Sequence, residues 1–307
     1  MSYSIVFFGT SDFAVPSLKA LLADQRFDVK AVVTQPDQPV GRHQVMTAPP
    51  IKVTAQENKL AVFQFEKIKD TEALKTLADF KADFFVVASY GQIIPQSVLD
   101  LPNIGPINVH GSLLPKWRGA SCVQSAIAAG DKEAGITIML MDALMDHGPI
   151  ISQTATEILA DDTGESLHDR LAELGARNLP DVLNQFAQGK LKPVEQDHTK
   201  ATACKLLKRD DGKIDWSKSA EEIERLIRAY NPWPSAWMIS NKKRIKILKT
   251  RILGVLKSPR RHGEIFAQDE KLVVNCGDNK ALEILELQPE GKKAMTAKQF
   301  LAGNHSF

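Results

Sequence analysis

Short apolar runs that alternate with helical stretches are the feature that most limits what the first half of this chain can fold into. Residues 4–8 (SIVFF), 29–33 (VKAVV) and 84–88 (FFVVA) have the length and composition of buried strands. Apolar residues at helical spacing follow the first run at 13–22 and precede the third at 71–80. Because strands that alternate with helices form parallel sheets covered on both faces, we expect a Rossmann-type, doubly wound α/β domain.

Three more strands and one long helix are predicted before the pattern changes. The strands are expected at 107–110 (INVH), 135–140 (GITIML) and 149–153 (PIISQ). The helix is expected at 165–188, with Thr163 as its N-terminal cap and Gly189 at its end. Pro180 lies inside this stretch, so a kink or a break is expected there, because proline has no N–H to donate.

Periodicity is lost after this helix, which indicates a domain boundary. Residues 190–208 are rich in polar side chains and are predicted to be a linker. After a further helix at 219–228, short strands alternate with turn signals, a pattern typical of a small β-barrel. OB-like barrels of this kind commonly bind nucleic acids. We therefore expect an α/β domain at 1–189 and a basic, OB-like β-barrel domain at 209–307.

Several ligands and locations are disfavoured by what the sequence lacks. The turn FFGTSDFA at 7–14 has no G-x-G-x-x-G series and the chain has no G-x-x-x-x-G-K-[ST], so neither NAD nor ATP in a P-loop is expected. The three cysteines stand far apart and no H-E-x-x-H occurs, so no disulfide framework and no metal site are expected. No apolar window is long enough to span a membrane and no basic segment precedes the first apolar run, so we expect a cytoplasmic protein.

Charge divides the chain more sharply than its net value of +2 suggests. Residues 205–307 carry 21 Lys and Arg against 13 Asp and Glu, whereas residues 1–204 carry 18 against 24. Residues 241–261 (NKKRIKILKTRILGVLKSPRR) hold nine basic residues and no acidic one, at strand-like spacing. Such a run can be a solvated strand whose lysines protect a sheet edge. The local absence of counter-charge favours a polyanion-binding surface.

Asn108 and His110 are the first candidates for chemistry. They lie two residues apart on a predicted strand, so both side chains point to one face near its carboxyl end. Open α/β sheets bind their ligands at that edge. A loop with two glycines, a proline, a tryptophan and an arginine follows at 111–120, where a ligand can approach the backbone. A histidine bonded into the core is the alternative, but the position of the pair beside this loop favours a function.

A carboxylate is expected near the same edge of the sheet. Asp146 lies in MDALMDHGPI, between two predicted strands. It is either a turn aspartate that bonds its own backbone or a functional group beside Asn108 and His110. Asp142 competes for the same role, and His147 is interpreted as a turn residue.

The residues around these candidates resemble a known family. The string NVHGSLLPKWRGA at 108–120 resembles the signature of enzymes that transfer a formyl group from 10-formyltetrahydrofolate. Further matches are FFGTSDFA at 7–14, TQPDQPVGR at 34–42, MDALMDHG at 141–148, KIDWSKSAEEIERLIRAYNPWP at 213–234 and LQPEGKKAMTAKQFL at 287–301. These segments span nearly the whole chain, and the closest resemblance is to the methionyl-tRNA formyltransferases.

The resemblance implies a reaction and the residues for it. The formyl group of 10-formyltetrahydrofolate would pass to the free amino group of methionine on initiator methionyl-tRNA, by direct attack and without a metal. Asn108, His110 and Asp146 would be the catalytic set, in which the first two stabilise the oxyanion and Asp146 orients His110. The folate would lie along Ser112, Leu113, Leu114 and Pro115.

The expected macromolecular partner is the initiator methionyl-tRNA. The enzyme itself is expected to be a monomer. The resemblance places the loop at 34–52 at the acceptor end and the C-terminal domain on the tRNA backbone. The residues expected to contact the tRNA are Arg42, Lys242, Lys243, Arg244 and Lys246. The alternative is a folate-dependent sugar-nucleotide N-formyltransferase, which shares the Asn, His and Asp set but needs no large basic surface.

Overall fold

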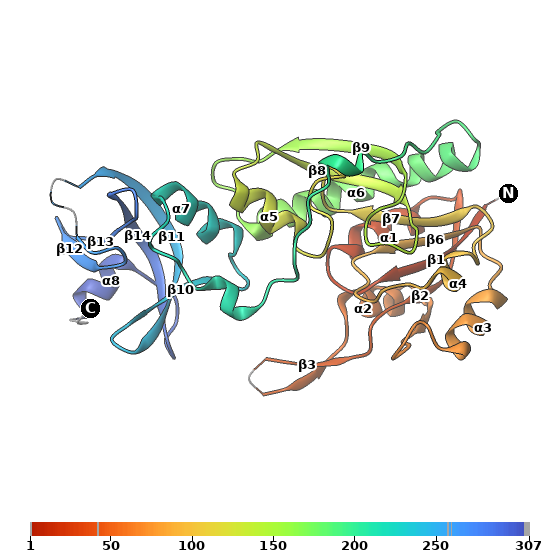
Figure 1. Ribbon diagram of the computed structural model, residues 1–307. Helices are drawn as coiled ribbons and strands as arrows, with labels where there is room; N and C mark the ends of the chain where they lie inside the picture. The colour runs from red at the N-terminus through yellow and green to blue at the C-terminus, as the bar shows by residue number, and fades with distance from the viewer. Residues whose placement is uncertain (1, 42, 257, 259, 304–307) are drawn as a thin grey trace. The chain divides into compact units, whose positions relative to one another are not determined.

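The computed structural model describes residues 2–41, 43–256, 258 and 260–303, and the chain divides into two compact units (Figure 1). The first unit comprises Met1–Cys122, Ala134–Thr156 and His168–Cys204. The second unit comprises Val123–Glu133, Glu157–Leu167 and Lys205–Phe307. The division after Cys204 falls inside the segment predicted to be a linker.

The first unit contains most of a seven-stranded sheet in the order β5-β2-β1-β6-β7-β8-β9. Its strands are β1 (Tyr3–Gly9), β2 (Phe27–Val33), β5 (Ala61–Phe63), β6 (Phe84–Ala88), β7 (Gly105–His110), β8 (Glu133–Leu140) and β9 (Ile150–Glu157). All pairings from β5 to β7 are parallel, which confirms the expected Rossmann-type arrangement. β7 and β8 are antiparallel, with Ile107 opposite Leu140. The strand pattern did not predict this pairing, because an apolar run looks the same in either direction.

The strand order reverses at the centre of this sheet. From β1 the chain moves outward to β2 and β5, and it then returns to β6 on the other side of β1. In open α/β sheets, ligands bind beyond the carboxyl ends of the strands near such a reversal. Because β1, β6 and β7 are parallel neighbours, their carboxyl ends lie at one edge of the sheet.

Side chains of the central strands are buried on both faces. Phe7, Phe8, Phe84 and Phe85 are at most 1% exposed, as expected where helices cover both faces. The helices in this part of the chain are α1 (Ala14–Ala23), α2 (Pro50–Glu57), α3 (Thr71–Asp79), α4 (Gln96–Leu99), α5 (Cys122–Ala129), which belongs mostly to the second unit, and α6 (Gly164–Ala187). Gly9 allows α1 to begin close to the sheet, because a Cβ there would lie 2.7 Å from the Cβ of Ala14.

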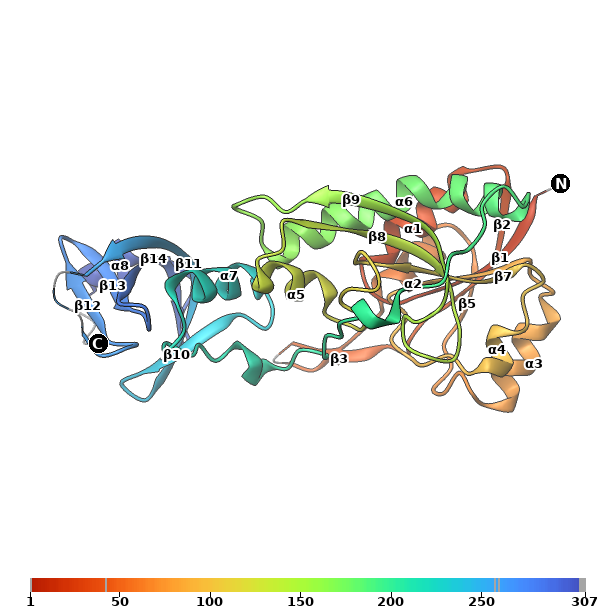
Figure 2. The ribbon, with the colours of Figure 1, turned by 45° about the horizontal axis from the view of Figure 1, so that its top comes forward.

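The long helix α6 runs alongside β8 and β9 (Figure 2) and passes through Pro180 without a break. The helix is therefore not broken at Pro180, and a kink there stays a prediction. Burial of an apolar stripe that includes Leu183, 0% exposed, offsets the hydrogen bond that the proline cannot make. The ends are as predicted. Thr163 Oγ1 accepts a hydrogen bond from the N–H of Ser166, and Gly189 ends the helix with a φ of +68°.

A short hairpin within the loop at 34–52 was not predicted as strands. It consists of β3 (Gln38–Val40) and β4 (Val45–Thr47), and it extends away from the sheet of its unit (orange in Figure 1). Its apolar side chains face solvent, with Val45 and Met46 61% and 63% exposed. Strands of three residues are too short to show a periodicity in the sequence.

The second unit contains an antiparallel sheet in the order β10-β11-β14-β13-β12, with β15 paired to β14. Its elements are α7 (Ala220–Ala229), β10 (Ala236–Ser240), β11 (Lys243–Val255), β12 (Ile265–Gln268), β13 (Lys271–Asn275), β14 (Lys280–Pro289), β15 (Met295–Thr296) and α8 (Ala297–Ala302). Ile223 and Ile227 of α7 share an apolar core with Ile245 and Ile247 of β11. This confirms a C-terminal antiparallel β domain, while its closure into an OB-like barrel stays a prediction. In the part of the chain that is described, no helix has the length and apolar composition to cross a membrane.

Candidate active site

Asn108 and His110 lie at the carboxyl end of β7, where they are 9% and 7% exposed. The apolar residues between and before them, Ile107 and Val109, are buried on the opposite face. This alternation anchors the strand in the core and turns both polar side chains to the same side, as their spacing predicts.

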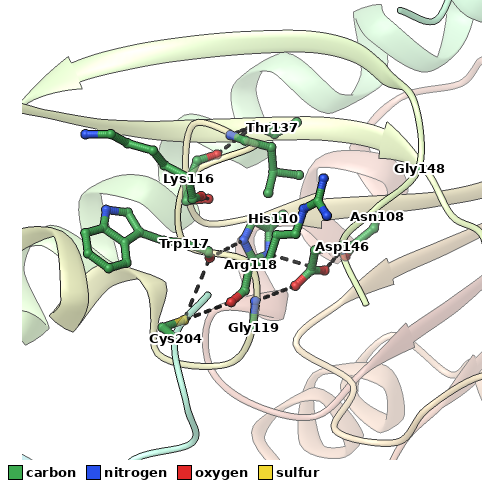
Figure 3. A network of polar contacts seen from close by, with 12 residues as sticks. Asn108, His110, Lys116, Trp117, Arg118, Gly119, Thr137, Asp146, Gly148 and Cys204 are labelled. Carbon is green, nitrogen blue, oxygen red and sulfur yellow. Dashed lines mark hydrogen bonds and ion pairs between the residues drawn. The ribbon is translucent and has the colours of Figure 1, made fainter. Parts of the chain in front are cut away.

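Asp146 lies in the turn between β8 and β9, with a left-handed φ of 50°. Its Oδ1 accepts a hydrogen bond from Asn108 Nδ2 at 3.2 Å, and its Oδ2 accepts one from the N–H of Gly119 at 2.7 Å. The same Oδ1 lies 3.6 Å from Nδ1 of His110. The structure therefore brings the three predicted residues into one cluster at the sheet edge (Figure 3).

The contacts of His110 determine where its hydrogens lie. Nε2 is 3.1 Å from the carbonyl oxygen of Trp117, and because a carbonyl only accepts, Nε2 carries a hydrogen. Neutral His110 then has its lone pair on Nδ1, which faces the carboxylate of Asp146. A proton at Nδ1 would therefore lie between the ring and this carboxylate. The ring can therefore take up a proton at Nδ1 while Nε2 holds its orientation.

The structure also separates Asp146 from its competitor, Asp142. Asp142 accepts hydrogen bonds from Nδ1 of His147 at 2.7 Å and from the N–H of Leu144 at 2.9 Å. His147 stacks on His198 with ring centroids 4.1 Å apart. These contacts show Asp142 bonded within its own turn, whereas Asp146 bonds the residues at the end of β7.

The loop after β7 is held in place by residues that follow α6. Gly119 has a φ of +112°, and a Cβ there would lie 2.3 Å from the carbonyl oxygen of Cys204, so only glycine fits. The N–H of Arg118 donates to the carbonyl of Thr202 at 2.9 Å, and the N–H of Cys204 donates to the carbonyl of Arg118 at 2.8 Å. With the backbone of Gly119 packed this closely against Cys204, the N–H of Gly119 points at the carboxylate of Asp146.

Four residues of this loop are the predicted binding segment for a flat ligand: Ser112, Leu113, Leu114 and Pro115. Thr137 Oγ1 donates to the carbonyl of Ser112 at 2.6 Å and accepts from the N–H of Leu114 at 3.1 Å. Gln153 Nε2 donates to the carbonyl of Leu114 at 2.8 Å. The N–H of Leu114 is therefore used within the protein, while each carbonyl oxygen keeps a second lone pair for a ligand. The segment is well supported, and its binding role stays a prediction.

Sequence reasoning missed three groups that contact this cluster. The carbonyl of Trp117 and the N–H of Gly119 are backbone groups, which leave no pattern in a sequence. The third group is the side chain of Gln196, 5% exposed, which donates to the carbonyl of Asp146 at 3.0 Å. Gln196 lies in the segment without periodicity, so no signal marked it.

The cluster offers hydrogen-bond donors and a proton acceptor and is suited to acyl-type transfer. Asn108 Nδ2 carries two hydrogens, of which Asp146 accepts one, so the second can stabilise an oxyanion. His110 Nδ1 can accept a proton beside the carboxylate. No group of three or more His, Cys, Asp or Glu side chains is arranged to hold a metal ion within the described ranges.

Of the five residues predicted to contact tRNA, Arg42 lies outside the described residues. The other four lie in the second unit, Lys242 in the turn before β11 and Lys243, Arg244 and Lys246 at the start of that strand. Both residues before Arg244 are exposed, and Arg244 itself is partly covered. Its guanidinium carbon lies 3.9 Å from the ring centroid of Trp237.

The basic run is not free of counter-charge once folded. Arg251 pairs with Glu283 at 2.6 Å, and Arg260 pairs with Glu264 at 3.0 Å. The expectation of a one-signed surface is therefore wrong for these arginines, because folding and a neighbouring turn bring carboxylates to them. Across the described part of the chain, no ion pair involves Lys242, Lys243, Lys246 or Lys249. The lysines of β11 and the turn before it thus supply the uncompensated positive charge.

Comparison with solved structures shows one shared fold. An N-formyltransferase from Helicobacter canadensis, in complex with folinic acid and dTDP-3-aminofucose, superposes with a TM-score of 0.67 at 19% identity, covering 94% of this chain and 100% of that one. A sugar N-formyltransferase from Shewanella gives a TM-score of 0.62 at 18% identity, covering 80% and 96%. HypX from Aquifex aeolicus, with tetrahydrofolic acid, gives 0.63 at 15% identity, covering 98% of this chain and 47% of that one. The chain thus spans about half the length of HypX.

Two family models also match. Residues 3–183 match the formyl transferase model, and residues 206–305 match the model of the formyl transferase C-terminal domain. The first match alone spans more than half of the 307 residues, so the chain belongs to the formyl transferase family.

Proposed function

We propose that this protein transfers the formyl group of 10-formyltetrahydrofolate to an amino group by direct attack. The observation that carries the proposal is the contact of one carboxylate, Asp146, with both Asn108 and His110 at the ligand-binding edge of the sheet. Solved relatives of the same fold hold folinic acid or tetrahydrofolic acid, which supports a folate as the donor. The carbonyls of Ser112 and Leu114 and the side chain of Leu113 would contact it.

Asn108 and His110 divide the chemistry between them in this proposal. Asn108 donates its second Nδ2 hydrogen to the formyl oxygen as a C–N bond forms and negative charge develops there. His110 Nδ1 accepts the proton that the attacking amine loses. The same proton passes on to the folate nitrogen as its bond to the formyl carbon breaks, so that both products leave neutral at these atoms. Asp146 stabilises the transient positive charge on His110.

We propose methionine esterified to initiator tRNA as the amine. The motifs of the resemblance extend through both units, and the uncompensated lysines of β11 provide charge for a phosphate backbone. Lys242 and Lys243 are exposed at the turn into this strand. Arg244, which stacks on Trp237 and lies 3.9 Å from a carboxylate oxygen of Asp210, adds a partly compensated cation beside them.

A sugar nucleotide carrying an amino group is the second candidate acceptor. The observation that favours it is the likeness to the Helicobacter canadensis enzyme, whose structure contains dTDP-3-aminofucose and which covers 94% of this chain. At 19% identity that likeness shows a shared fold. A sugar nucleotide carries few charges, so its use would give the lysines of β11 no part in binding.

The deciding experiment offers labelled 10-formyltetrahydrofolate with each acceptor in turn. We expect formylation of initiator methionyl-tRNA, less of elongator methionyl-tRNA, and none of dTDP-3-aminofucose or related amino sugars. Formylation of an amino sugar alone would overturn the tRNA proposal and leave the folate site standing. Transfer to neither acceptor, with no release of formate from the donor, would overturn the folate proposal as well.

A further inference from the structure

The amide of Gln196 joins the two loops that build the active site. It is 5% exposed and lies in the segment between α6 and the second unit. Its Nε2 donates to the carbonyl oxygens of Asp146 at 3.0 Å and Gly148 at 2.8 Å. Its Oε1 accepts from Nε of Arg118 at 3.2 Å and from a terminal nitrogen of Arg118 at 2.7 Å. All four hydrogen-bonding positions of the amide are used.

The partners of Gln196 permit only one orientation of this amide. Carbonyl oxygens can only accept hydrogen bonds, and a guanidinium can only donate them. A reversed amide would place its oxygen against the carbonyls of Asp146 and Gly148 and its hydrogens against those of Arg118. The NH₂ group therefore holds the Asp146 turn, and the oxygen holds the loop after β7.

The Asp146 turn needs such support because its backbone is strained. A φ of 50° is uncommon for a residue with a side chain, and such a conformation persists where surrounding contacts enforce it. Gly119 and Asn108 hold the carboxylate of Asp146, but neither contacts its carbonyl. Gln196 holds that carbonyl. Rotation of the peptide would carry the carboxylate away from His110, and it is opposed by Gln196 at the carbonyl and by Gly119 and Asn108 at the carboxylate.

We infer that Gln196 is a positioning residue for the transfer reaction. It fixes the backbone at Asp146 and Gly148 against Arg118, so that Oδ1 of Asp146 stays within reach of Asn108 and His110. The inference rests on the proposed function, because its effect on rate is an effect on formyl transfer. A displacement of about 1 Å in a catalytic group can lower the rate about 100-fold.

The substitution Gln196→Glu tests this with little change of volume. The new carboxylate keeps both acceptors for Arg118 but places an oxygen against the carbonyls of Asp146 and Gly148. We expect kcat to fall about 10- to 100-fold, with little change in KM for either substrate. The ratio of variant to wild-type kcat should rise as pH is lowered, because protonation of the carboxyl restores one donor to the turn. A purely structural defect would not recover in this way.

Two further variants and one spectrum complete the experiment. Gln196→Met removes all four hydrogen bonds without adding a charge and should lose activity at every pH. Gln188→Glu is the matched control, because Gln188 is exposed and its side chain bonds Asn184, at 3.0 Å, away from the site. ¹⁵N NMR of the His110 ring without substrates should show a shift in Gln196→Glu and none in Gln188→Glu.

The outcomes separate this inference from the proposed function. No formyl transfer by the wild type to any amine overturns the proposed function, while the His110 spectrum still reports whether Gln196 positions the site. Wild-type activity with an unchanged kcat and unchanged His110 signals in Gln196→Glu overturns the inference. A change confined to KM overturns it too, because that would make Gln196 a binding residue.

Discussion

Asp146 joins the backbone and side-chain groups of the site through its two carboxylate oxygens. One oxygen bonds the backbone of Gly119, and the other faces both Asn108 and His110. The residue therefore has two roles: it orients the amide that would face an oxyanion, and it places a negative charge beside the nitrogen that would take up a proton. The first needs two acceptor oxygens and the second needs a negative charge, so a neutral amide at this position would lose the charge and one of the two acceptors.

We expect Asp146→Asn to lower kcat for formyl transfer by about 10²- to 10⁴-fold, the range for loss of general acid–base assistance. The amide can still accept from the N–H of Gly119, but its NH₂ group then faces the donor Nδ2 of Asn108, and it cannot stabilise a charged His110. Asp142→Asn is the control, because Asp142 bonds His147 and Leu144 within its own turn. Equal losses of kcat in the two variants, measured with saturating substrates, would contradict the assignment.

Sequence reasoning reached the side chains of this site but not the backbone and amide groups around them. Asn108 and His110 could be found because period two and a sheet edge are properties of a strand. Asp146 could be placed between two strands. The sequence did not show whether Asp146 or Asp142 contacts Asn108 and His110, because that depends on the folded structure. Gln196 could not be found at all, because its partners lie about 50 and 78 positions away and its segment has no periodic pattern.

Among the elements, the strands whose side chains are buried on both faces of the sheet were predicted best. β1, β2 and β6 are largely apolar because both faces of the central sheet are buried, and that composition is visible in the sequence. Strand direction is not visible, so the antiparallel pairing of β7 with β8 was missed. Local preference left open whether Pro180 would kink α6 or break it, and tertiary packing keeps the helix continuous.

The start of α7 gives a prediction about one element. The N–H of Glu222 donates to Oγ of Ser219 at 3.2 Å, and the N–H and hydroxyl of Ser219 donate to Glu222 Oε2 at 3.0 and 2.7 Å. We expect Ser219→Ala to lower the free energy of unfolding of the second unit by about 1 kcal/mol at neutral pH, measured by urea denaturation. Ser219→Asp should keep most of the stability, because aspartate also caps helices.

The same cap makes this effect depend on pH. Hydrogen bonds from the side chain and N–H of Ser219 hold the pKa of Glu222 below its ordinary value. A lowered folded-state pKa adds stability above the unfolded-state pKa, and that stability is lost as pH falls through the folded-state value. The difference between wild type and Ser219→Ala should therefore shrink in acid. An equal difference at neutral and acid pH would show that the carboxylate takes no part in the cap.

At the scale of the whole molecule, charge is distributed differently in the fold than along the chain. The run at 241–261 has no acidic residue among its nine basic ones, yet Arg251 is paired with Glu283 from β14. A sequence shows local neighbours only, so the pairing across strands was invisible. The surface that remains for a polyanion is smaller than the run suggests and consists mainly of lysines.

This distribution leads to a prediction about salt. We expect the triple variant Lys242→Ala/Lys243→Ala/Lys246→Ala to weaken binding of initiator methionyl-tRNA and to flatten its dependence on salt. The slope of log affinity against log salt should become shallower by about 1 for every phosphate that the variant no longer binds. The kcat at saturating tRNA should change little, because the active-site residues are untouched.

A second triple variant separates phosphate binding from net charge. Lys67, Lys69 and Lys75 are exposed around α3 in the first unit, so their replacement by alanine removes the same charge elsewhere. If long-range attraction alone draws the tRNA to the protein, both variants will show the same change of slope. A slope that changes only in the β11 variant would place the tRNA backbone on these lysines. A wild-type affinity independent of salt would exclude a polyanion from this surface and favour the amino sugar as acceptor.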